Sequence, residues 1–579
     1  MKFIFAVALA VLVQISCAGA AKLTAEVESL AQGLRDQAPL PVEISLTWTG
    51  TEVVTGQMIA LIHEQQRNRR RVVLDDVVVQ PGTRRFSLLL PPVQLDEVMT
   101  QLELDLTLEL PDGRRELGSW VVGTKLGKLM QLSVAELSAG FGAGDTRLAA
   151  GANPLVVFAD ALPLEAEDQL SMRITALANT RAPRQALAWL AWDMVVVRAG
   201  ADQGLDKAQL KALLAWTGAG GLLLVEDLAR SGPALQAATK EADALGDGCF
   251  IYGRGRIAQC QVGGADMGPS ARFLWGDDMV GAVSATMMGR DYYEYGDNGD
   301  AQQLTDALMP DTIRLVPIWA LVLTLVVFVI AIGPLEWLVL GAIGKRVLTW
   351  VTFPLTALVC TGFTLALSQH YLGNDDHRAA VTVVDIGLNG RVVRQERIEL
   401  QFAAHNTEVE VSMAGALVGL VDADRNPIDS GVWYGQPGQT GQYRFTLPKW
   451  TPRLVRSLRF DDRDLEGLDL DWSAVLAEPR HNMRAALQQR YGSEAAVFHA
   501  SAGNERHGGN AAAIPEWLRT SLSMGSHDRG RAIGRAPRAG NSLLDVFPTV
   551  APGDDRLVVM LPGDDGELLV LRRDFRRQP

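Results

Sequence analysis

The segment Leu315–Leu335 reads LVPIWALVLTLVVFVIAIGPL and decides how this 579-residue chain is organised. It contains no charged side chain, and at about 1.5 Å per residue a helix of roughly 21 residues crosses a hydrocarbon core about 30 Å thick. A second apolar segment, VLTWVTFPLTALVCTGFTLALSQHYL, occupies Val347–Leu372. We therefore predict a membrane hairpin of two transmembrane helices, at 313–340 and 347–372.

The short connection of this hairpin sets its expected orientation. Lys345 and Arg346 are its cations, and short loops that carry Lys and Arg stay on the cytoplasmic side of a membrane. Both flanking regions are then expected outside the cytoplasm. Glu336 is the acidic residue of the hairpin, and we expect it near the cytoplasmic interface, since at the bilayer centre it would mark a proton or ion path. Gly333-Pro334 is expected to kink or end the first helix.

Composition agrees with a protein that is partly embedded in a membrane. Hydrophobic residues make up 48% of the chain and the mean hydropathy is +0.08, which also argues against a disordered chain. The length predicts three or four domains. A formal net charge of −13 is unlike a surface that neutralises phosphates, so we expect no nucleic-acid partner.

The first 20 residues are typical of a signal peptide. Met1-Lys2 precedes the apolar run Phe3–Ile15, and Ala18-Gly19-Ala20 supplies small residues for cleavage after Ala20. The alternative is a lipoprotein in which Cys17 carries the lipid. Gln14 argues against it, because a small aliphatic residue is normally needed there.

Residues 21–130 are expected to form an immunoglobulin-like β-sandwich. Short segments of alternating or continuous apolar character are separated by turns that contain Gly, Pro or Asn, the spacing expected of such a fold. The predicted strands are Val42–Trp48, Val53–Ile62, Val72–Val79, Arg85–Leu90, Leu102–Leu110 and Leu117–Val122. The basic run at Arg67 and Arg69–Arg71 falls in a predicted turn, where a solvated tip is favoured over an acidic ligand.

Residues 150–263 are expected to form a doubly wound α/β domain. Apolar segments at Pro154–Asp160, Met194–Val197 and Gly220–Glu226 predict buried parallel strands. Helices are predicted near Leu164–Thr175 and over Asp206–Trp216, the latter with Asp206 as its cap. Strand, helix, strand, helix, strand in this order implies right-handed crossovers within one sheet.

Cys249 and Cys260 flank two short strands around a glycine turn. A hairpin centred on Arg254-Gly255 would place the two cysteines opposite one another, and in an oxidising compartment a disulfide between them is one expectation. Cross-strand pairs at a hydrogen-bonded position fit disulfide geometry poorly. The alternative is two small buried hydrophobic residues.

Two parts of the chain together carry a resemblance. Trp192–Val197 (WDMVVV), Leu210–Trp216 and Gly220–Val225 resemble the class I glutamine amidotransferase-like domain of bacterial envelope proteins, and Gly333–Leu340 with Leu348–Pro354 is similar to the Gly-Pro-containing hairpin of those proteins. The resemblance covers roughly residues 150–390. It implies an anchor in the bacterial cytoplasmic (inner) membrane, with the N- and C-terminal domains in the periplasm. Such relatives often accompany von Willebrand A-domain proteins, AAA ATPases or ABC transporters.

The remaining regions are described by composition and pattern. Residues 264–312 are a connector rich in Gly, Asp and Tyr. Strand-like segments make 375–470 a β-rich domain. Residues 471–579 are expected to be partly helical and partly flexible, and to close with a hairpin of Arg556–Leu561 and Glu567–Arg572.

A catalytic set is missing from the α/β region. An amidotransferase needs a cysteine on the turn after a strand and a histidine to activate it, yet Glu226 and Asp227 stand at that turn, and no histidine occurs between His63 and His370. We therefore expect no enzyme activity and no cofactor. Glu226 and Asp227, with Asp160, are candidates for a weak ligand or metal site; the favoured alternative is that they cap helices or face solvent.

Histidine spacing predicts no metal centre. His63-Glu64 begins like a zinc-protease helix, but Arg67 stands where the second histidine is needed. Three hypotheses for function follow. The first is a non-catalytic periplasmic scaffold of an envelope complex, the second a periplasmic hydrolase that uses the carboxylates Asp160, Glu226 and Asp227, and the third an accessory subunit of an ABC-type transporter.

Overall fold

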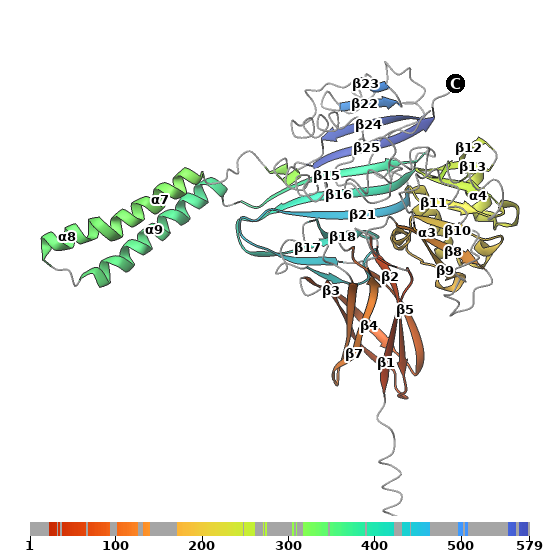
Figure 1. Cartoon of the computed structure of the whole chain (residues 1–579), viewed down its shortest axis with the longest axis horizontal. Coiled ribbons are helices and arrows are strands. Elements are labelled where there is room, and N and C mark those ends of the chain that lie inside the picture. The colour runs from red at the N-terminus through yellow and green to blue at the C-terminus, as the bar shows by residue number, and fades with distance from the viewer. Residues whose placement is uncertain are drawn as a thin grey trace, which may run out of the picture.

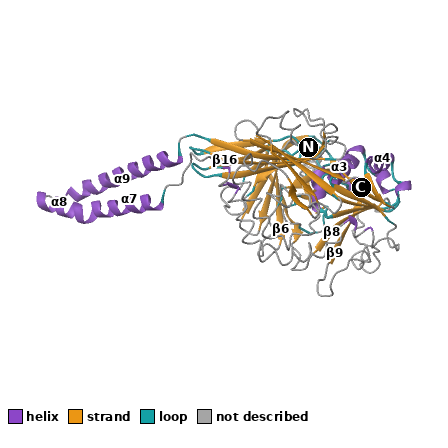
Figure 2. Ribbon diagram, turned by 90° about the horizontal axis from the view of Figure 1, so that it is seen from above, coloured by secondary structure: helices purple, strands orange, loops and turns teal. Residues whose placement is uncertain are grey.

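The computed structural model is a mixed α/β protein, mostly strands, in four sheets from which a pair of apolar helices projects (Figures 1 and 2). The structure describes residues 22–31, 33–34, 38–64, 68–92, 101–124, 131–138, 171–246, 248–260, 270, 273–274, 304–305, 308–309, 317–344, 348–373, 375–387, 391–421, 431–439, 442–463, 496–501, 504–507, 554–562 and 567–576.

Two sheets form the first part of the body, and their strands pair antiparallel except for β19 and β4 in the larger one. The smaller has the order β1 (Leu23–Ser29), β2 (Leu40–Trp48), β5 (Gly82–Leu90). The larger has the order β17 (Thr407–Ser412), β20 (Gln442–Leu447), β19 (Val432–Tyr434), β4 (Asn68–Val79), β3 (Val54–Glu64), β6 (Gln101–Leu110), β7 (Gly113–Thr124). Alternation explains these strands, because every second side chain of β2 is buried in a core shared with β3 and β6. The six strands predicted in this region are confirmed.

The larger of these sheets joins parts of the chain that lie on either side of the apolar helices. Strand β19 pairs in parallel with β4, with Val432 opposite Arg71 and Tyr434 opposite Val73. Strands β17 and β20 continue the sheet from β19. The regions expected as 21–130 and 375–470 therefore share one sheet.

The basic run is not in a turn over its described part. Strands β3 and β4 stay paired as far as Glu64 and Asn68, so only three residues are left to connect them. Arg70 is buried and donates a hydrogen bond to the carbonyl oxygen of Pro92. The prediction underestimated the length of the two paired strands.

A third sheet forms the α/β unit. Its order is β12 (Asp243–Gly246), β13 (Cys249–Tyr252), β14 (Gly255–Gln259), β11 (Leu222–Val225), β10 (Met194–Val197), β8 (Gln131–Ser138), β9 (Ser171–Ala178). The strands from β14 to β9 are parallel, and β13 and β12 add an antiparallel edge. The predicted strands at β10 and β11 are confirmed. Pro154–Asp160 lies outside the described residues.

The helix expected near Leu164–Thr175 is wrong over its described part. Ser171–Ala178 is strand β9, which pairs in parallel with β8 along its whole length. Strand β8 lies upstream of residue 150, so it falls before the region from which the α/β pattern was derived. The prediction did not include β8, so it had no strand with which Ser171–Ala178 could pair.

Helix α3 (Lys207–Gly218) forms where it was predicted. Asp206 caps it through hydrogen bonds from the N–H groups of Ala208 and Gln209, and the Gln209 side chain accepts from the N–H of Asp206 at 2.8 Å. Trp216 of this helix lies 6.4 Å from Trp189, ring centre to ring centre. Short 3-10 turns η1 (Asn179–Arg181), η2 (Ala186–Ala191), η3 (Ala201–Gly204) and η4 (Leu228–Arg230) and helix α4 (Pro233–Glu241) complete the described connections.

The fourth sheet is built mainly from the region after the apolar helices. Its order is β18 (Leu417–Leu420), β21 (Arg453–Arg463), β16 (Val392–Phe402), β15 (His377–Ile386), β25 (Glu567–Arg576), β24 (Asp554–Pro562), β22 (Ala496–Ser501), β23 (Asn504–His507). The antiparallel pair β24 and β25 confirms the predicted closing hairpin. Leu304 and Leu308, which precede the apolar helices, pack against this sheet. Both ends of the apolar pair therefore return to one body.

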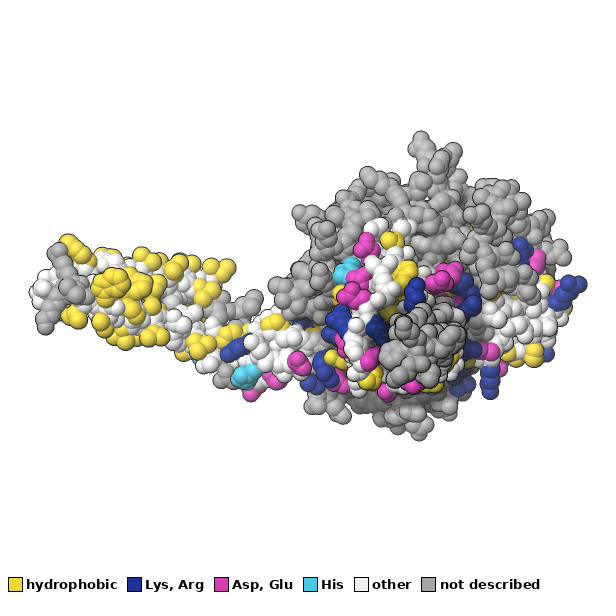
Figure 3. All heavy atoms as spheres, turned by 90° about the horizontal axis from the view of Figure 1, so that it is seen from below, with side chains coloured by type: hydrophobic (Ala, Val, Ile, Leu, Met, Phe, Trp, Pro, Cys, Tyr) yellow, Lys and Arg dark blue, Asp and Glu magenta, His cyan; other side chains and the backbone are white. Residues whose placement is uncertain are grey.

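The apolar pair consists of α7 (Ile318–Ile330), the π-helical turn η5 (Ala331–Leu335) and α8 (Glu336–Ile343), followed by α9 (Thr349–Leu372). Both arms, Ile318–Ile343 and Thr349–Tyr371, are long and apolar enough to cross a membrane, with mean hydropathies of 2.7 and 1.6. Hydrophobic side chains cover them, whereas charged side chains gather on the body (Figure 3). Pro334 lacks an N–H, and the first arm passes it through the π-helical turn rather than ending there.

Ion pairs join the α/β unit to the other sheets, and the one at Asp385 is buried. Arg254, at the turn between β13 and β14, bonds to Asp385 of β15 at 2.5 Å, and Arg572 of β25 bonds to the same carboxylate at 2.6 Å. Burial alone would raise the pKa of Asp385, but the guanidinium groups of Arg254 and Arg572 outweigh it and hold that pKa well below its ordinary value. Arg181 likewise bridges Glu28 and Glu43 on the first sheet, at 2.7 and 2.8 Å.

Candidate functional site

The carboxyl ends of the parallel strands bring several charged side chains to one edge of the α/β sheet. This edge is where open α/β sheets usually bind ligands. Strand β10 ends at Val197 and is followed by Arg198, while β11 ends at Val225 and is followed by Glu226 and Asp227. The backbone of the two strand ends is joined by a hydrogen bond from the N–H of Glu226 to the oxygen of Val197 at 3.0 Å.

Arg198 lies between two carboxylates at this edge. Its Nε donates to Oε1 of Glu136 at 2.5 Å, and its Nη1 contacts Oε1 of Glu226 at 3.2 Å. The second oxygen of Glu226 accepts the N–H of Ala199 at 3.0 Å. Glu136 is 1% exposed, and its Oε2 has no hydrogen-bond partner. Both oxygens of Glu226 are therefore engaged within the fold.

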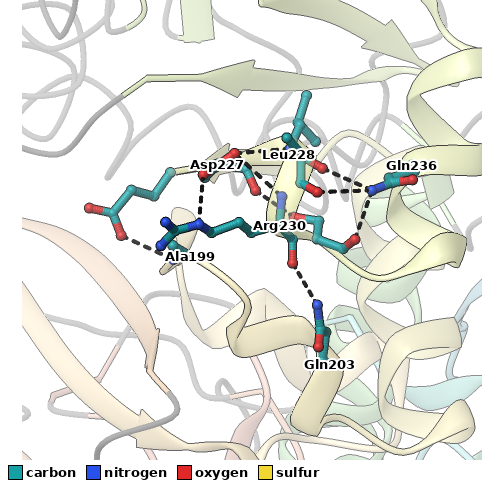
Figure 4. Close-up of polar contacts among 9 residues, drawn as sticks. Ala199, Gln203, Asp227, Leu228, Arg230 and Gln236 are labelled. Carbon is teal, nitrogen blue, oxygen red and sulfur yellow. Dashed lines mark hydrogen bonds and ion pairs between the residues drawn. The ribbon is translucent and has the colours of Figure 1, made fainter.

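Asp227 serves as a cap. Its Oδ1 accepts the N–H groups of Ala229 and Arg230 at 3.0 and 3.4 Å, and its Oδ2 lies 3.5 Å from Nε of Arg230 (Figure 4). These are the contacts expected of a residue that begins a helical turn. The carboxylate of Asp227 therefore caps the turn η4, as the alternative to a ligand site predicted.

Neighbouring side-chain amides hold the same turn from outside. Gln203 donates to the carbonyl oxygen of Arg230 at 2.7 Å, and Gln236 donates to those of Leu228 and Ser231 at 3.2 and 2.9 Å (Figure 4). Three carbonyl oxygens of the turn are thus satisfied by side chains from η3 and α4. The turn after β11 is therefore held in place by side-chain hydrogen bonds.

Asp202 is a further carboxyl group near this edge. It is 2% exposed, its Oδ2 accepts the N–H of Gly232 at 2.6 Å, and its Oδ1 has no hydrogen-bond partner. Burial raises the pKa of Asp202 above its ordinary value, against the lowering effect of the Gly232 hydrogen bond. Asp202 therefore fastens η3 to the start of α4.

The predicted site residues are only partly brought together. Glu226 and Asp227 lie at one edge, as expected, but each has its own partners, and Asp160 lies outside the described residues. Within the ranges that the structure describes, no group of three or more His, Cys, Asp and Glu side chains is placed to hold a metal ion. Sequence reasoning missed Glu136, Arg198 and Asp202. The available signal for Glu136 was a charge inside the apolar run Val134–Leu137.

The cysteines do not face each other as the hairpin prediction required. The turn lies at Gly253-Arg254, one residue earlier than expected, and Gly253 takes a φ of +63° there. Cys249 consequently pairs with Ala258, and Cys260 lies beyond the end of β14. No disulfide joins Cys249 to Cys260, and burial raises the pKa of the Cys249 thiol.

Comparison with known proteins gives no family. No family model and no curated protein matches the chain. Solved structures match only weakly. A solution structure of a late embryogenesis abundant protein is 12% identical, covering 19% of this chain and 75% of its own, with a TM-score of 0.15. Beta-glucuronidase 2 of Bacteroides uniformis is 12% identical, covering 35% and 23%, also at 0.15.

A Paenibacillus cycloisomaltooligosaccharide glucanotransferase is 10% identical, covering 36% of this chain and 28% of its own, at a TM-score of 0.17. This chain thus spans about a quarter of the length of either sugar-processing enzyme. Similarity at this level supports no argument about fold or activity.

Proposed function

We propose that this protein is a non-catalytic scaffold anchored in the bacterial cytoplasmic membrane, with its strand-rich body in the periplasm as part of an envelope complex. The observation that carries the proposal is the pair of exposed apolar helices on a body whose sheets use both flanks of that pair. Residues before and after the helices pair directly in β4 and β19. They must therefore lie on the same side of a membrane, which two spans allow and one span forbids.

Aromatic residues support a spanning position. Trp319 and Trp337 are 66% and 64% exposed, near the two ends of the first arm. They are 18 residues apart, about 27 Å along a helix. Trp350 and Tyr371 mark the ends of α9 at a separation of about 31 Å. Both distances match a hydrocarbon core of about 30 Å, whose interfaces favour Trp and Tyr.

The side chains between the two arms support a hairpin packed within lipid. Exposed positions are mainly Leu, Val, Ile and Trp, whereas the partly covered positions of α9 include Thr352, Thr356, Ala357, Cys360 and Thr364. Small and hydroxyl side chains let membrane helices approach closely. Glu336, one residue before Trp337, accepts a hydrogen bond from Thr352 of the other arm. That position supports an interfacial place for this carboxylate.

The strand order of the α/β unit supports the resemblance to amidotransferase-like domains. It does not support an enzyme activity. Numbered along the chain, its parallel strands β9, β8, β10, β11 and β14 follow the order 2-1-3-4-5 of flavodoxin-like sheets. We propose on this ground an amidotransferase-like fold, together with an immunoglobulin-like sandwich in the first part of the body. Glu226 and Asp227 at the α/β edge are engaged in an ion pair and a cap, which argues against the hydrolase alternative.

The topology is tested by reporter fusions in the full chain. A reporter inserted at Gly344 is expected to be active on the cytoplasmic side only, and one at the C-terminal Pro579 on the periplasmic side only. Replacing Lys345 and Arg346 by Glu is expected to weaken this orientation, whereas Arg378→Glu, just beyond α9 on the body side, leaves it unchanged. The reverse pattern at Gly344 and Pro579 would overturn the proposed orientation.

The scaffold role is tested by purification of the tagged full chain from membranes in mild detergent. We expect co-purification of a von Willebrand A-domain protein, an AAA ATPase or an ABC transporter component, the partners implied by the resemblance. Recovery of the chain alone, at native expression and in several detergents, would contradict a role in an envelope complex.

A further inference from the structure

We propose that the body makes a second contact with the membrane, through a rim formed by the turns 403–406 and 448–452. This inference rests on the proposed membrane-spanning hairpin and adds to it a contact with the phospholipid headgroups of the same bilayer. The rim is the part of the body nearest the hairpin in two perpendicular views (Figures 1 and 2).

The neck of α9 places the rim close to the bilayer. Four residues, 373–376, separate Leu372, the end of α9, from His377, the start of β15, so the two are about 18 Å apart at most when the chain is fully extended. His377 is paired with Phe402, after which the chain enters the first turn of the rim. Asp376 of the neck accepts the N–H of Ala404 at 2.8 Å, so neck and rim are directly joined.

The two turns of the rim are held to one another. The N–H of Trp450 donates to the oxygen of Ala403 at 2.8 Å, and the N–H of Lys449 donates to the side chain of Asn406 at 2.7 Å. The rim is therefore one surface, and it is bonded to the neck through Asp376.

Lys449 and Trp450 give this surface the chemistry of a membrane interface. Nζ of Lys449 lies 3.9 Å from the centre of the Trp450 ring. The indole Nε1 is covered within the fold, so the exposed part of the half-buried ring is apolar. A cation above an apolar aromatic edge matches the headgroup region, where Trp and Lys anchor proteins.

The backbone of Trp450 has an unfavourable conformation. Its φ is +61°, a left-handed value that is unusual for a bulky residue. Trp450 is one of two described non-glycine residues with a positive φ, the other being Asp76 at a solvent-exposed position in β4. Strained backbone values of this kind cluster at binding sites, and contact with a surface in front of the rim gives the one at Trp450 a role.

Charge around the rim selects the kind of lipid surface. Exposed Arg378 and His405 are accompanied by the exposed carboxylates Asp375 and Asp376. Such a balanced set suits zwitterionic headgroups, unlike the clusters of Lys and Arg that select anionic lipids. The expected occupant is therefore the general headgroup layer of a phospholipid bilayer.

The test uses the full chain in phosphatidylcholine vesicles, with an environment-sensitive fluorescent amino acid at one position and a headgroup-attached quencher in the lipid. Position 405 reports the rim, position 337 reports the hairpin, and Glu241 at the end of α4 is the matched body control, on the side away from the hairpin (Figure 1). Quenching at 405 is expected to be at least about three times that at 241, and to change little when phosphatidylglycerol is added.

Substitutions at Lys449 and Trp450 test whether these two residues make the contact. Lys449→Gln with Trp450→Ser is expected to lower quenching at 405 toward the value at 241, and Trp450→Phe to preserve most of it, which excludes simple misfolding. Quenching at 337 with none at 405 above that at 241 overturns the rim contact alone. Absence of quenching at 337 overturns the membrane hairpin itself.

Discussion

Asp385 and Asp202 are both aspartates with almost no exposure, at 1% and 2%, yet their surroundings differ in kind. Asp385 joins two units and faces the guanidinium groups of Arg254 and Arg572. Asp202 lies within the α/β unit, accepts the N–H of Gly232, and faces no cation in a described ion pair. The pKa of the first is lowered and that of the second raised. A buried carboxylate thus stabilises a junction only when cations are buried with it.

Asp385→Asn is expected to destabilise the protein more than the other two substitutions. It removes the buried carboxylate that faces Arg254 and Arg572, so we expect a loss of about 3–5 kcal/mol in the free energy of unfolding. The measurement is denaturant unfolding of the full chain in detergent. The control is Asp112→Asn, whose carboxylate is 63% exposed in its pair with Arg115, where a loss below about 1 kcal/mol is expected. Equal losses would contradict the role assigned to Asp385.

Arg254→Met removes one of the two cations and should cost less. Asp385 keeps Arg572, so we expect a loss of about 1–3 kcal/mol, in the range of hydrogen bonds to charged groups. Protease cleavage between the α/β unit and the fourth sheet is also expected to increase. Arg230→Met is the matched control, because this side chain is 75% exposed in its pair with Asp227. An effect as small as that of the control would show that the junction does not depend on Arg254.

Asp202→Asn is expected to have the smallest effect and the opposite sign at neutral pH. A raised pKa in the folded state means that the wild-type carboxylate is penalised above its unfolded pKa of about 3.9. The amide keeps an acceptor for Gly232, so we expect a change between zero and about 1 kcal/mol in favour of the folded state at pH 7. This gain should vanish as the pH falls below about 4, which unfolding curves at several pH values would check. A gain that persists at pH 3 would contradict the explanation.

Local patterns in the sequence predicted much of the fold. The alternation in Val42–Trp48 and the apolar run Met194–Val197 correspond to β2 and β10, and the cap at Asp206 begins α3. Each of these depends on neighbours within a few residues. The pairing of β19 with β4 depends instead on segments about 360 residues apart, for which no local pattern exists.

The sequence predicted where the candidate site lies, but not which partners its side chains have. Glu226 and Asp227 follow a buried strand, so their position at the carboxyl edge follows from the sequence. Their engagement does not, because it depends on Arg198 lying between Glu136 and Glu226 after β8 and β10 have paired. The cysteine pairing failed for a smaller reason, a turn placed one residue away from the expected one.

The parallel pairing of β4 with β19 also fixes an order of assembly. When β4 leaves the ribosome, its edge partner is still unsynthesised, and both arms of the apolar hairpin are made before Val432–Tyr434. Until then β4 presents an unpaired edge, which is open to pairing with other chains. In the proposed membrane-spanning arrangement, the larger sheet is complete only after the hairpin has been made and both flanks have reached one side of the bilayer. Insertion of the proposed hairpin is then a precondition for closing that sheet.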